Sequence, residues 1–299
     1  MTQPTFFDSE TPLPDDKLAK KERTLLGFDD RYVKIRNQLG LLLNIGELAT
    51  WSKKHHGGEV LAICGFVAEQ YPLIVFHGDV GTGKTATAEC VANRWVSEAR
   101  AEDSILFKLS NRVRGSGKVG EMGTFIADAF HKVVQSAGKH RRAILIIDEG
   151  DSLAAQRSQD QSHHEDKVAV NTLIQCVDDL RRHGGRIVVF LCTNRGSVLD
   201  AAIQRRAAIV EEFKRPDDTE RRQLFVMDLK GLKFSEAQIG ILVTATGAQG
   251  TRPTWTYSDI RTRLYPAALA LAFPNVALHF DHFKIAAESL RPSPVMEDK

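Results

Sequence analysis

One glycine-rich stretch, residues 78–85, constrains the fold of this chain more than any other feature. It reads Gly-Asp-Val-Gly-Thr-Gly-Lys-Thr and fits the pattern GxxxxGKT of a phosphate-binding loop. An apolar run, Leu73 to His77, precedes it, and good helix formers follow from Lys84 to Ala99. In this order of strand, loop and helix, glycines let backbone amides converge on phosphates at a helix N-terminus. A chance glycine turn is the alternative, which this context disfavours.

The loop predicts a site for ATP and Mg²⁺. We expect Lys84 to meet the β- and γ-phosphates and Thr85 to ligate magnesium. The expected nucleotide contacts in the loop are Gly78, Asp79, Val80, Gly81, Thr82, Gly83, Lys84, Thr85 and Ala86.

Two adjacent carboxylates end a second apolar run. Residues 143–147 read Ala-Ile-Leu-Ile-Ile and lead directly into Asp148 and Glu149. Both carboxylates therefore lie at the carboxyl end of a buried strand, where open α/β sheets bind ligands. The chain between Lys84 and Asp148 has room for one more strand with its helices, which would set the two motifs side by side. We expect Asp148 to hold magnesium through water and Glu149 to polarise the attacking water; an ordinary acidic turn is the alternative.

Further polar residues follow the next apolar run. Asn194 comes just after residues 186–191 and could orient the water or the γ-phosphate, although asparagine is also a common turn or cap residue. Arg205 and Arg206 follow at a place where a cation could reach out of the sheet. An arginine that stabilises charge on the γ-phosphate contributes about 10³ to 10⁵ in rate. A solvated surface pair is the alternative.

Apolar runs alternate with helical stretches over the first two thirds of the chain, which predicts a parallel sheet with helices on both faces. Beyond Pro216 only helical patterns remain, which predicts a small helical lid domain. The organisation we expect is an N-terminal arm, mobile or folded onto a partner, at residues 1–30, a large α/β domain at 31–216, a lid at 217–290 and a loose tail at 291–299.

Composition narrows the possible functions. Forty Lys and Arg against 38 Asp and Glu give a net charge of +2, so no strong field favours a polyanion such as DNA. The four cysteines show no CxxC spacing, which disfavours a zinc site or a disulfide framework. The N-terminus is unlike a signal peptide, and no apolar run approaches the roughly 20 residues of a membrane helix. We therefore expect a cytoplasmic protein.

Together these features resemble the AAA+ P-loop ATPases over about residues 40–290. Within that class, a set of short spaced matches resembles the pachytene-checkpoint ATPases, which are hexameric rings that partly unfold HORMA-domain proteins. The matches are Ser116 to Lys118, Ile147 to Glu149, Ser152 to Arg157, Asn171 to Leu173 and Asp200 to Ala207. A compact chain of this kind resembles the bacterial members, which accompany HORMA proteins and a nucleotide-second-messenger synthase in anti-phage (CBASS) systems.

The resemblance implies roles for several arginines. It makes Arg206, rather than Arg205, the arginine finger, which acts on the active site of a neighbouring subunit and so implies a ring, expected to be a hexamer. It also implies a nucleotide-sensing arginine on the lid near Ser258. Arg261 is our choice for that role, and Arg263 competes with it.

The resemblance also implies a substrate-gripping pore loop at residues 111–120. Arg112 and Val113 would face the channel, and Lys118 belongs to the same loop. Val113 stands where the family usually carries an aromatic residue, which implies a weaker or differently tuned grip on the substrate. Residues 1–77 are too few for a separate recruiting domain as well as the start of the ATPase module. The ring itself is therefore expected to capture its substrate, a HORMA-domain protein.

The leading interpretation is an ATP-hydrolysing ring that remodels a protein partner. The alternative is an ATP-dependent switch on DNA, such as a transposition or replication helper, which would usually carry a basic stripe. A nucleotide-dependent scaffold without turnover is a third class. Glu149 argues against it, because binding alone needs no water-activating carboxylate.

Overall fold

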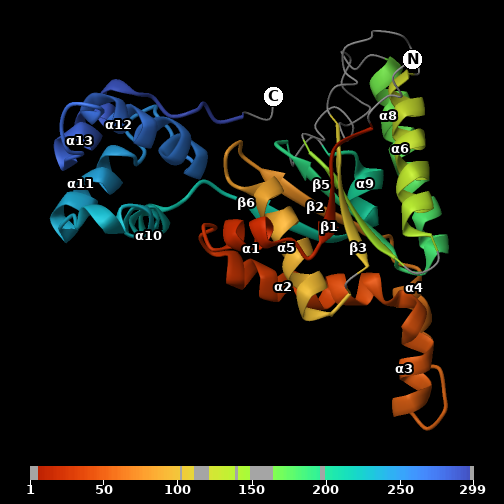
Figure 1. Cartoon of the computed structure of the whole chain (residues 1–299). Coiled ribbons are helices and arrows are strands. Elements are labelled where there is room, and N and C mark those ends of the chain that lie inside the picture. The colour runs from red at the N-terminus through yellow and green to blue at the C-terminus, as the bar shows by residue number, and fades with distance from the viewer. Residues whose placement is uncertain are drawn as a thin grey trace. The chain divides into compact units, whose positions relative to one another are not determined.

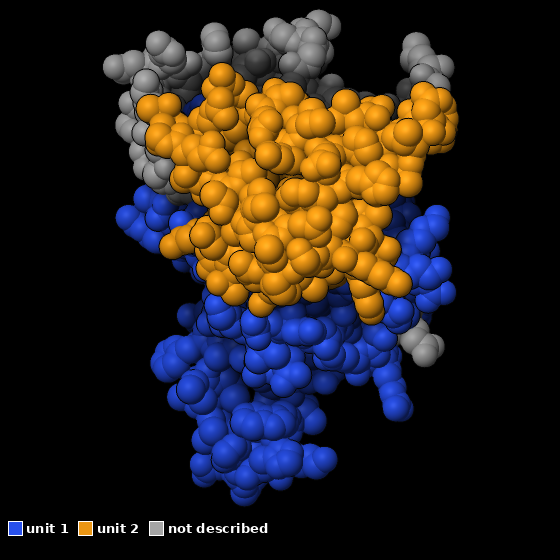
Figure 2. Space-filling view, turned by 90° about the vertical axis from the view of Figure 1, so that its left-hand side faces the viewer, with its two compact units in different colours: residues 1–77, 85–212 blue, residues 78–84, 213–299 orange. Residues whose placement is uncertain are grey.

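The computed structural model describes residues 6–101, 103–110, 121–138, 141–148, 164–195 and 199–296 (Figure 1). The chain divides into two compact units, which Figure 2 shows in different colours. The first comprises Met1–His77 and Thr85–Glu212. The second comprises Gly78–Lys84 and Phe213–Lys299, so the phosphate-binding loop groups with the C-terminal part of the chain.

The described strands form one six-stranded sheet in the order β1-β3-β4-β5-β2-β6. Strands β2 to β5 pair in parallel, and β1 pairs with β3 antiparallel at one edge. The predicted parallel sheet is thus confirmed for its four inner strands. The strand bounds are β1 Phe7–Leu13, β2 Leu73–Gly78, β3 Ser104–Leu109, β4 Arg142–Ile147, β5 Ile187–Thr193 and β6 Ala207–Phe213.

The inner strands are apolar on both faces because helices cover both sides of the sheet (Figure 1). Val75, Leu145 and Val189 point to the face covered by helices α6 (Glu121–Ala137) and α8 (His164–Leu180), and they share one core with them. Helices α2 (Phe28–Leu43) and α5 (Lys84–Glu98) lie on the other side. The other helices among the described residues of this unit are α1 Asp16–Glu22, α3 Leu48–His55, α4 Ala62–Ala68, α9 Ala201–Arg206 and the short 3₁₀ turns Ile45–Glu47 and Arg181–His183.

The N-terminal segment differs from the predicted arm at residues 1–30. Its strand β1 pairs with β3, and the buried ring of Phe7 lies 4.8 Å from that of Phe107. Helix α1 follows, begun by Asp15, whose carboxylate accepts a hydrogen bond from Leu18 N at 2.9 Å. The sequence shows no strand pattern here because only the two end residues of the strand, Phe7 and Leu13, are buried. An edge strand held by backbone hydrogen bonds needs no alternating apolar pattern.

The second unit is helical after Pro216. Its core includes Leu224, Phe225, Leu242, Trp255 and Phe283. The segment after Leu290 was expected to be a loose tail, but residues up to Met296 make specific hydrogen bonds within this unit, as described below. Its helices are α10 Asp218–Asp228, α11 Glu236–Ala245, α12 Tyr265–Ala272 and α13 Phe280–Ser289, with a 3₁₀ turn at Lys230–Leu232 and a π-helical turn, η5, at Asp259–Leu264.

Candidate nucleotide site

The phosphate-binding loop has a shape that glycine makes possible. Gly78 has a φ of 135°, and a Cβ there would lie 2.0 Å from the carbonyl oxygen of Phe213. Gly83 has a φ of 96°, and a Cβ there would meet no atom of the described residues within 4 Å apart from its chain neighbours, so backbone conformation rather than crowding selects glycine. The loop leads from β2 into α5, as predicted, and presents its backbone amides at the start of a helix.

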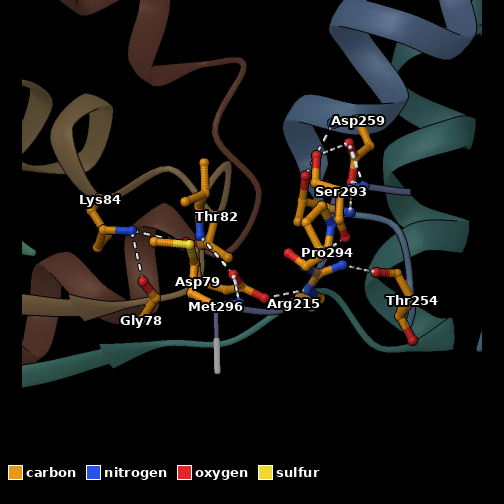
Figure 3. Close-up of polar contacts among 12 residues, drawn as sticks. Gly78, Asp79, Thr82, Lys84, Arg215, Thr254, Asp259, Ser293, Pro294 and Met296 are labelled. Atoms are coloured by element: carbon orange, nitrogen blue, oxygen red, sulfur yellow. Dashed lines mark hydrogen bonds and ion pairs between the residues drawn. The ribbon is translucent and has the colours of Figure 1, made fainter. Parts of the chain in front are cut away.

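Lys84 is folded back over the loop. Its Nζ donates to the carbonyl oxygens of Gly78 and Asp79 at 2.9 and 2.8 Å, and the side chain is only 6% exposed (Figure 3). The hydroxyl of Thr82 also donates to the Asp79 carbonyl, at 2.7 Å. An ammonium held by neutral carbonyls at this point can bind a phosphate oxygen, which carries a full charge and is the stronger acceptor.

Thr85 and Asp148 come together as predicted for a magnesium site. The hydroxyl of Thr85 donates to Asp148 Oδ1 at 2.7 Å. A hydroxyl and a carboxylate oxygen at this separation fit Mg²⁺, which takes few protein ligands and keeps several waters. The two residues thus supply a compatible pair of hard oxygen ligands.

Lys108 is a neighbour of this pair that the sequence did not single out. Its Nζ lies 3.4 Å from Asp148 Oδ2, and the side chain is 29% exposed. The register explains the proximity, because Lys108 on β3 pairs with Ile146, two residues before Asp148. Only the pairing of β3 with β4 reveals it, since nothing in the local sequence distinguishes this lysine from a surface residue.

Asn194 and Asp148 lie at the same edge of the sheet. Strands β4 and β5 run parallel with Ile147 opposite Leu191, so Asp148 and Asn194 follow the ends of adjacent strands. Asn194 is half-buried. Asn194 therefore follows the strand next to the one that ends before Asp148. Glu149 and the pore-loop residues Arg112, Val113 and Lys118 lie outside the described residues.

Arg206 binds an acidic residue of its own chain. Its Nε and Nη2 donate to the two carboxylate oxygens of Asp178 at 2.5 and 2.8 Å, and its guanidinium lies 5.0 Å from the centre of the Tyr71 ring. The hydrogen bonds to Asp178 raise the pKa of Arg206. Arg205, next to it on α9, is exposed. Action on a neighbouring subunit would require Arg206 to exchange Asp178 for phosphate.

Arg261, the expected lid contact to nucleotide, donates hydrogen bonds to Asp228 in the structure. Its Nε and Nη2 donate to the two oxygens of that carboxylate at 2.7 and 2.8 Å, and these bonds raise the pKa of Arg261. Tyr265 adds a hydroxyl bond to Asp228 at 3.2 Å. The π-helical turn that contains Arg261 aims it at this partly buried carboxylate. Among these lid residues it is Ser258 that meets the loop, because its N–H donates to Gly81 O at 3.1 Å.

Comparisons with known proteins identify the family. A model of the ATPase family associated with various cellular activities (AAA) matches residues 74–215. The chain is 64% identical to CD-NTase-associated protein 6 of Escherichia coli strain KTE188, and the match covers 100% of both proteins. The chain belongs to this family of AAA ATPases. A second CD-NTase-associated protein 6, from E. coli strain MS 115-1, is 35% identical over 98% of this chain and 97% of the relative.

Solved structures agree with this assignment. A chain in the E. coli MS115-1 HORMA:CdnC:Trip13 complex matches the AAA ATPase with a TM-score of 0.87 and 32% identity, over 99% of this chain and 100% of that one. Rhizobiales Trip13 matches with a TM-score of 0.69 and 29% identity, over 96% and 99%. The predicted resemblance and fold class are thus confirmed, and as an AAA ATPase the chain hydrolyses ATP. Among the described residues, no helix combines the length and apolar character that crossing a membrane requires.

Proposed function

We propose that this AAA ATPase assembles into a hexameric ring that uses ATP hydrolysis to disassemble or partly unfold a HORMA-domain protein. One observation carries the proposal: the match to a chain solved in a HORMA:CdnC:Trip13 complex extends over essentially the whole of both chains, with a TM-score of 0.87. The 64% identity to a CD-NTase-associated protein supports a role in regulating bacterial anti-phage signalling. Because the reaction consumes ATP and the four cysteines are free thiols, we also propose a cytoplasmic location.

The described residues divide the chemistry between them. The backbone amides of residues 78–86 bind the phosphates, and Lys84 moves its ammonium from the loop carbonyls to the β- and γ-phosphates. Thr85 and Asp148 would hold Mg²⁺, which when bound neutralises charge that develops on the phosphates. Lys108 holds the Asp148 carboxylate from its other side.

Three further residues act on water and the γ-phosphate. Glu149 polarises the attacking water, and Asn194, at the end of the adjacent strand β5, orients it. Arg206 of a neighbouring subunit then stabilises the charge on the γ-phosphate. Arg261 remains the proposed nucleotide-sensing arginine of the lid, a role that would require its guanidinium to exchange Asp228 for phosphate. Arg112, Val113 and Lys118 are the residues we propose to grip the partner in the ring's channel.

Partner-stimulated ATP turnover tests the proposed function. ATPase rates are measured for the protein alone, with a HORMA-domain protein from the same genome, and with duplex DNA. We expect the HORMA protein to stimulate turnover and DNA to have no effect. Glu149→Gln should bind ATP without hydrolysing it and accumulate as stable rings. Stimulation by DNA alone would favour a DNA-associated switch and contradict the proposed partner.

A further inference from the structure

Arg215 connects the phosphate-binding loop to the C-terminal end of the chain (Figure 3). It follows strand β6, and its side chain is only 10% exposed. Its Nε donates to Asp79 in the loop, and its Nη1 donates to the carbonyl oxygen of Thr254 at 2.6 Å. Its Nη2 donates to the carbonyl oxygens of Ser293 and Pro294 at 3.0 and 2.9 Å. One buried guanidinium thus binds three separate segments of the second unit.

Asp79 places a negative charge within the phosphate-binding loop. Its carboxylate is only 12% exposed and belongs to a loop whose backbone amides bind phosphates. A buried carboxylate is costly unless an opposite charge and hydrogen bonds satisfy it, and it repels a nearby phosphate. Arg215 supplies the opposite charge, and Val80 N donates to Asp79 Oδ1 at 2.9 Å. Arg215 thus balances the negative charge of Asp79, and the N–H of Val80 satisfies one of its carboxylate oxygens.

The C-terminal segment, residues 293–296, is fastened at both of its ends. At one end, Ser293 donates from its N–H to both oxygens of Asp259 at 3.2 Å and from its hydroxyl to Oδ1 at 2.6 Å. Burial would raise the pKa of Asp259, but hydrogen bonds from Ser293 and Thr256 lower it below its usual value. At the other end, Met296 N donates to Asp79 Oδ1 at 3.4 Å.

The same hydrogen-bond network includes the lid residues that contact the loop. Thr256 donates from its N–H to Asp259 at 3.0 Å, and Ser258 N binds Gly81 O at 3.1 Å. A Cβ on Gly81 would lie 2.7 Å from both the Ser258 Cβ and the Thr256 hydroxyl. The loop, the lid residues and the C-terminal segment therefore form one continuous set of contacts centred on Arg215.

We propose that Arg215 and residues 293–296, here called the C-terminal clasp, position the phosphate-binding loop for ATP. Arg215 is a positioning residue that acts through Asp79: it neutralises the carboxylate that would otherwise repel the phosphates, and it fixes the loop to the clasp. The inference rests on ATP binding at this loop, as proposed above. Loss of the clasp should weaken ATP binding much more than it slows the chemical step.

The test measures the Kd for ATP, together with KM and kcat, on the full-length protein. Arg215→Ala should raise Kd and KM about tenfold or more, the effect of losing one charged hydrogen-bonding group, with kcat within about threefold. Adding Asp79→Asn to Arg215→Ala should recover most of the affinity, because the repelling charge is gone. Removal of residues 292–299 should raise Kd by less, since Arg215 still faces Asp79. Arg222→Ala is the matched control: this lid arginine forms an exposed pair with Glu236 and should leave every parameter unchanged.

The outcomes separate the clasp from the ATP site itself. Wild-type protein that fails to bind ATP contradicts the site. If wild-type protein binds ATP and Arg215→Ala binds it with the same Kd, the clasp proposal alone is overturned. The clasp proposal is also overturned if Arg215→Ala binds ATP more weakly and the added Asp79→Asn does not restore the affinity, because Arg215 then has a merely structural role. If Arg215→Ala does not fold, Arg215→Lys takes its place, because lysine keeps the positive charge but loses hydrogen bonds to the carbonyl oxygens. A Kd for ATP equal to that of the wild type, both in Arg215→Lys and in the truncated protein, also overturns the proposal.

Discussion

Replacing Arg206 with alanine distinguishes a local ion pair from an arginine finger, because the two roles differ greatly in energy. In the structure Arg206 is 21% exposed and its partner Asp178 is 37% exposed. A pair so accessible to solvent contributes about 1 kcal/mol or less. The contact of the guanidinium with Tyr71 adds about 0.5–1 kcal/mol. The structural cost of Arg206→Ala is therefore about 2 kcal/mol of unfolding free energy at most.

Loss of an arginine finger costs far more, and it costs rate rather than stability. The expected decrease in kcat is about 10³-fold or more, which corresponds to roughly 4 kcal/mol of activation free energy. A protein with about 5–15 kcal/mol of stability remains almost entirely folded after losing about 2 kcal/mol. A thousandfold decrease therefore cannot come from unfolding, provided that ATP affinity and the melting temperature are measured alongside kcat.

Two variants and one mixing experiment complete the assay. Asp178→Ala removes the same ion pair and should keep kcat within a few-fold, and Arg205→Ala should keep it within about twofold. Arg206→Ala subunits mixed with Glu149→Gln subunits should regain part of the activity, because some intact Glu149 residues then meet an intact Arg206 of a neighbouring subunit. Arg206 is not an arginine finger acting on a neighbouring subunit if Asp178→Ala loses as much activity as Arg206→Ala, or if confirmed mixed rings stay inactive.

Further predictions concern the loop, the metal ligands, the N-terminal strand and acid stability. ATP with Mg²⁺ at 100 times its Kd should stabilise wild-type protein by about 2.7 kcal/mol in thermal unfolding and should not stabilise Lys84→Ala. Thr85→Ala should need about tenfold more Mg²⁺ for half-maximal turnover, whereas Thr85→Ser should behave like wild type. In urea unfolding, Leu13→Ala should cost about 2–5 kcal/mol and the exposed control Ser9→Ala less than about 0.5 kcal/mol. Because folding lowers the pKa of Asp259, its contribution to stability is present above about pH 4 and lost as pH falls further, so Asp259→Asn should flatten the acid-unfolding curve in that range.

The sequence predicted those parts of the fold and site that depend on local spacing. The loop pattern places Lys84 and Thr85 at the start of α5, and the apolar run before Asp148 places that carboxylate at a strand end. The parallel order of the strands then brings the Thr85 hydroxyl to 2.7 Å from Asp148 Oδ1. Local pattern sufficed here because strand, loop and helix are consecutive along the chain.

The features that the sequence missed depend on partners far along the chain. Lys108 reaches Asp148 only through the register of β3 with β4. Arg261 pairs with Asp228 on α10 at a sequence separation of 33 residues. Arg215 meets Asp79 at a sequence separation of 136 residues, which no local pattern reports.

The most direct test of the central claim measures what the ring does to its partner. Hydrogen–deuterium exchange of a HORMA-domain protein from the same genome is followed with the ATPase, with and without ATP. We expect ATP and wild-type protein together to increase exchange in part of the HORMA protein, and Glu149→Gln with ATP to leave it unchanged. If the wild-type ring hydrolyses ATP rapidly while exchange in its partner stays the same, the ring does not remodel this protein.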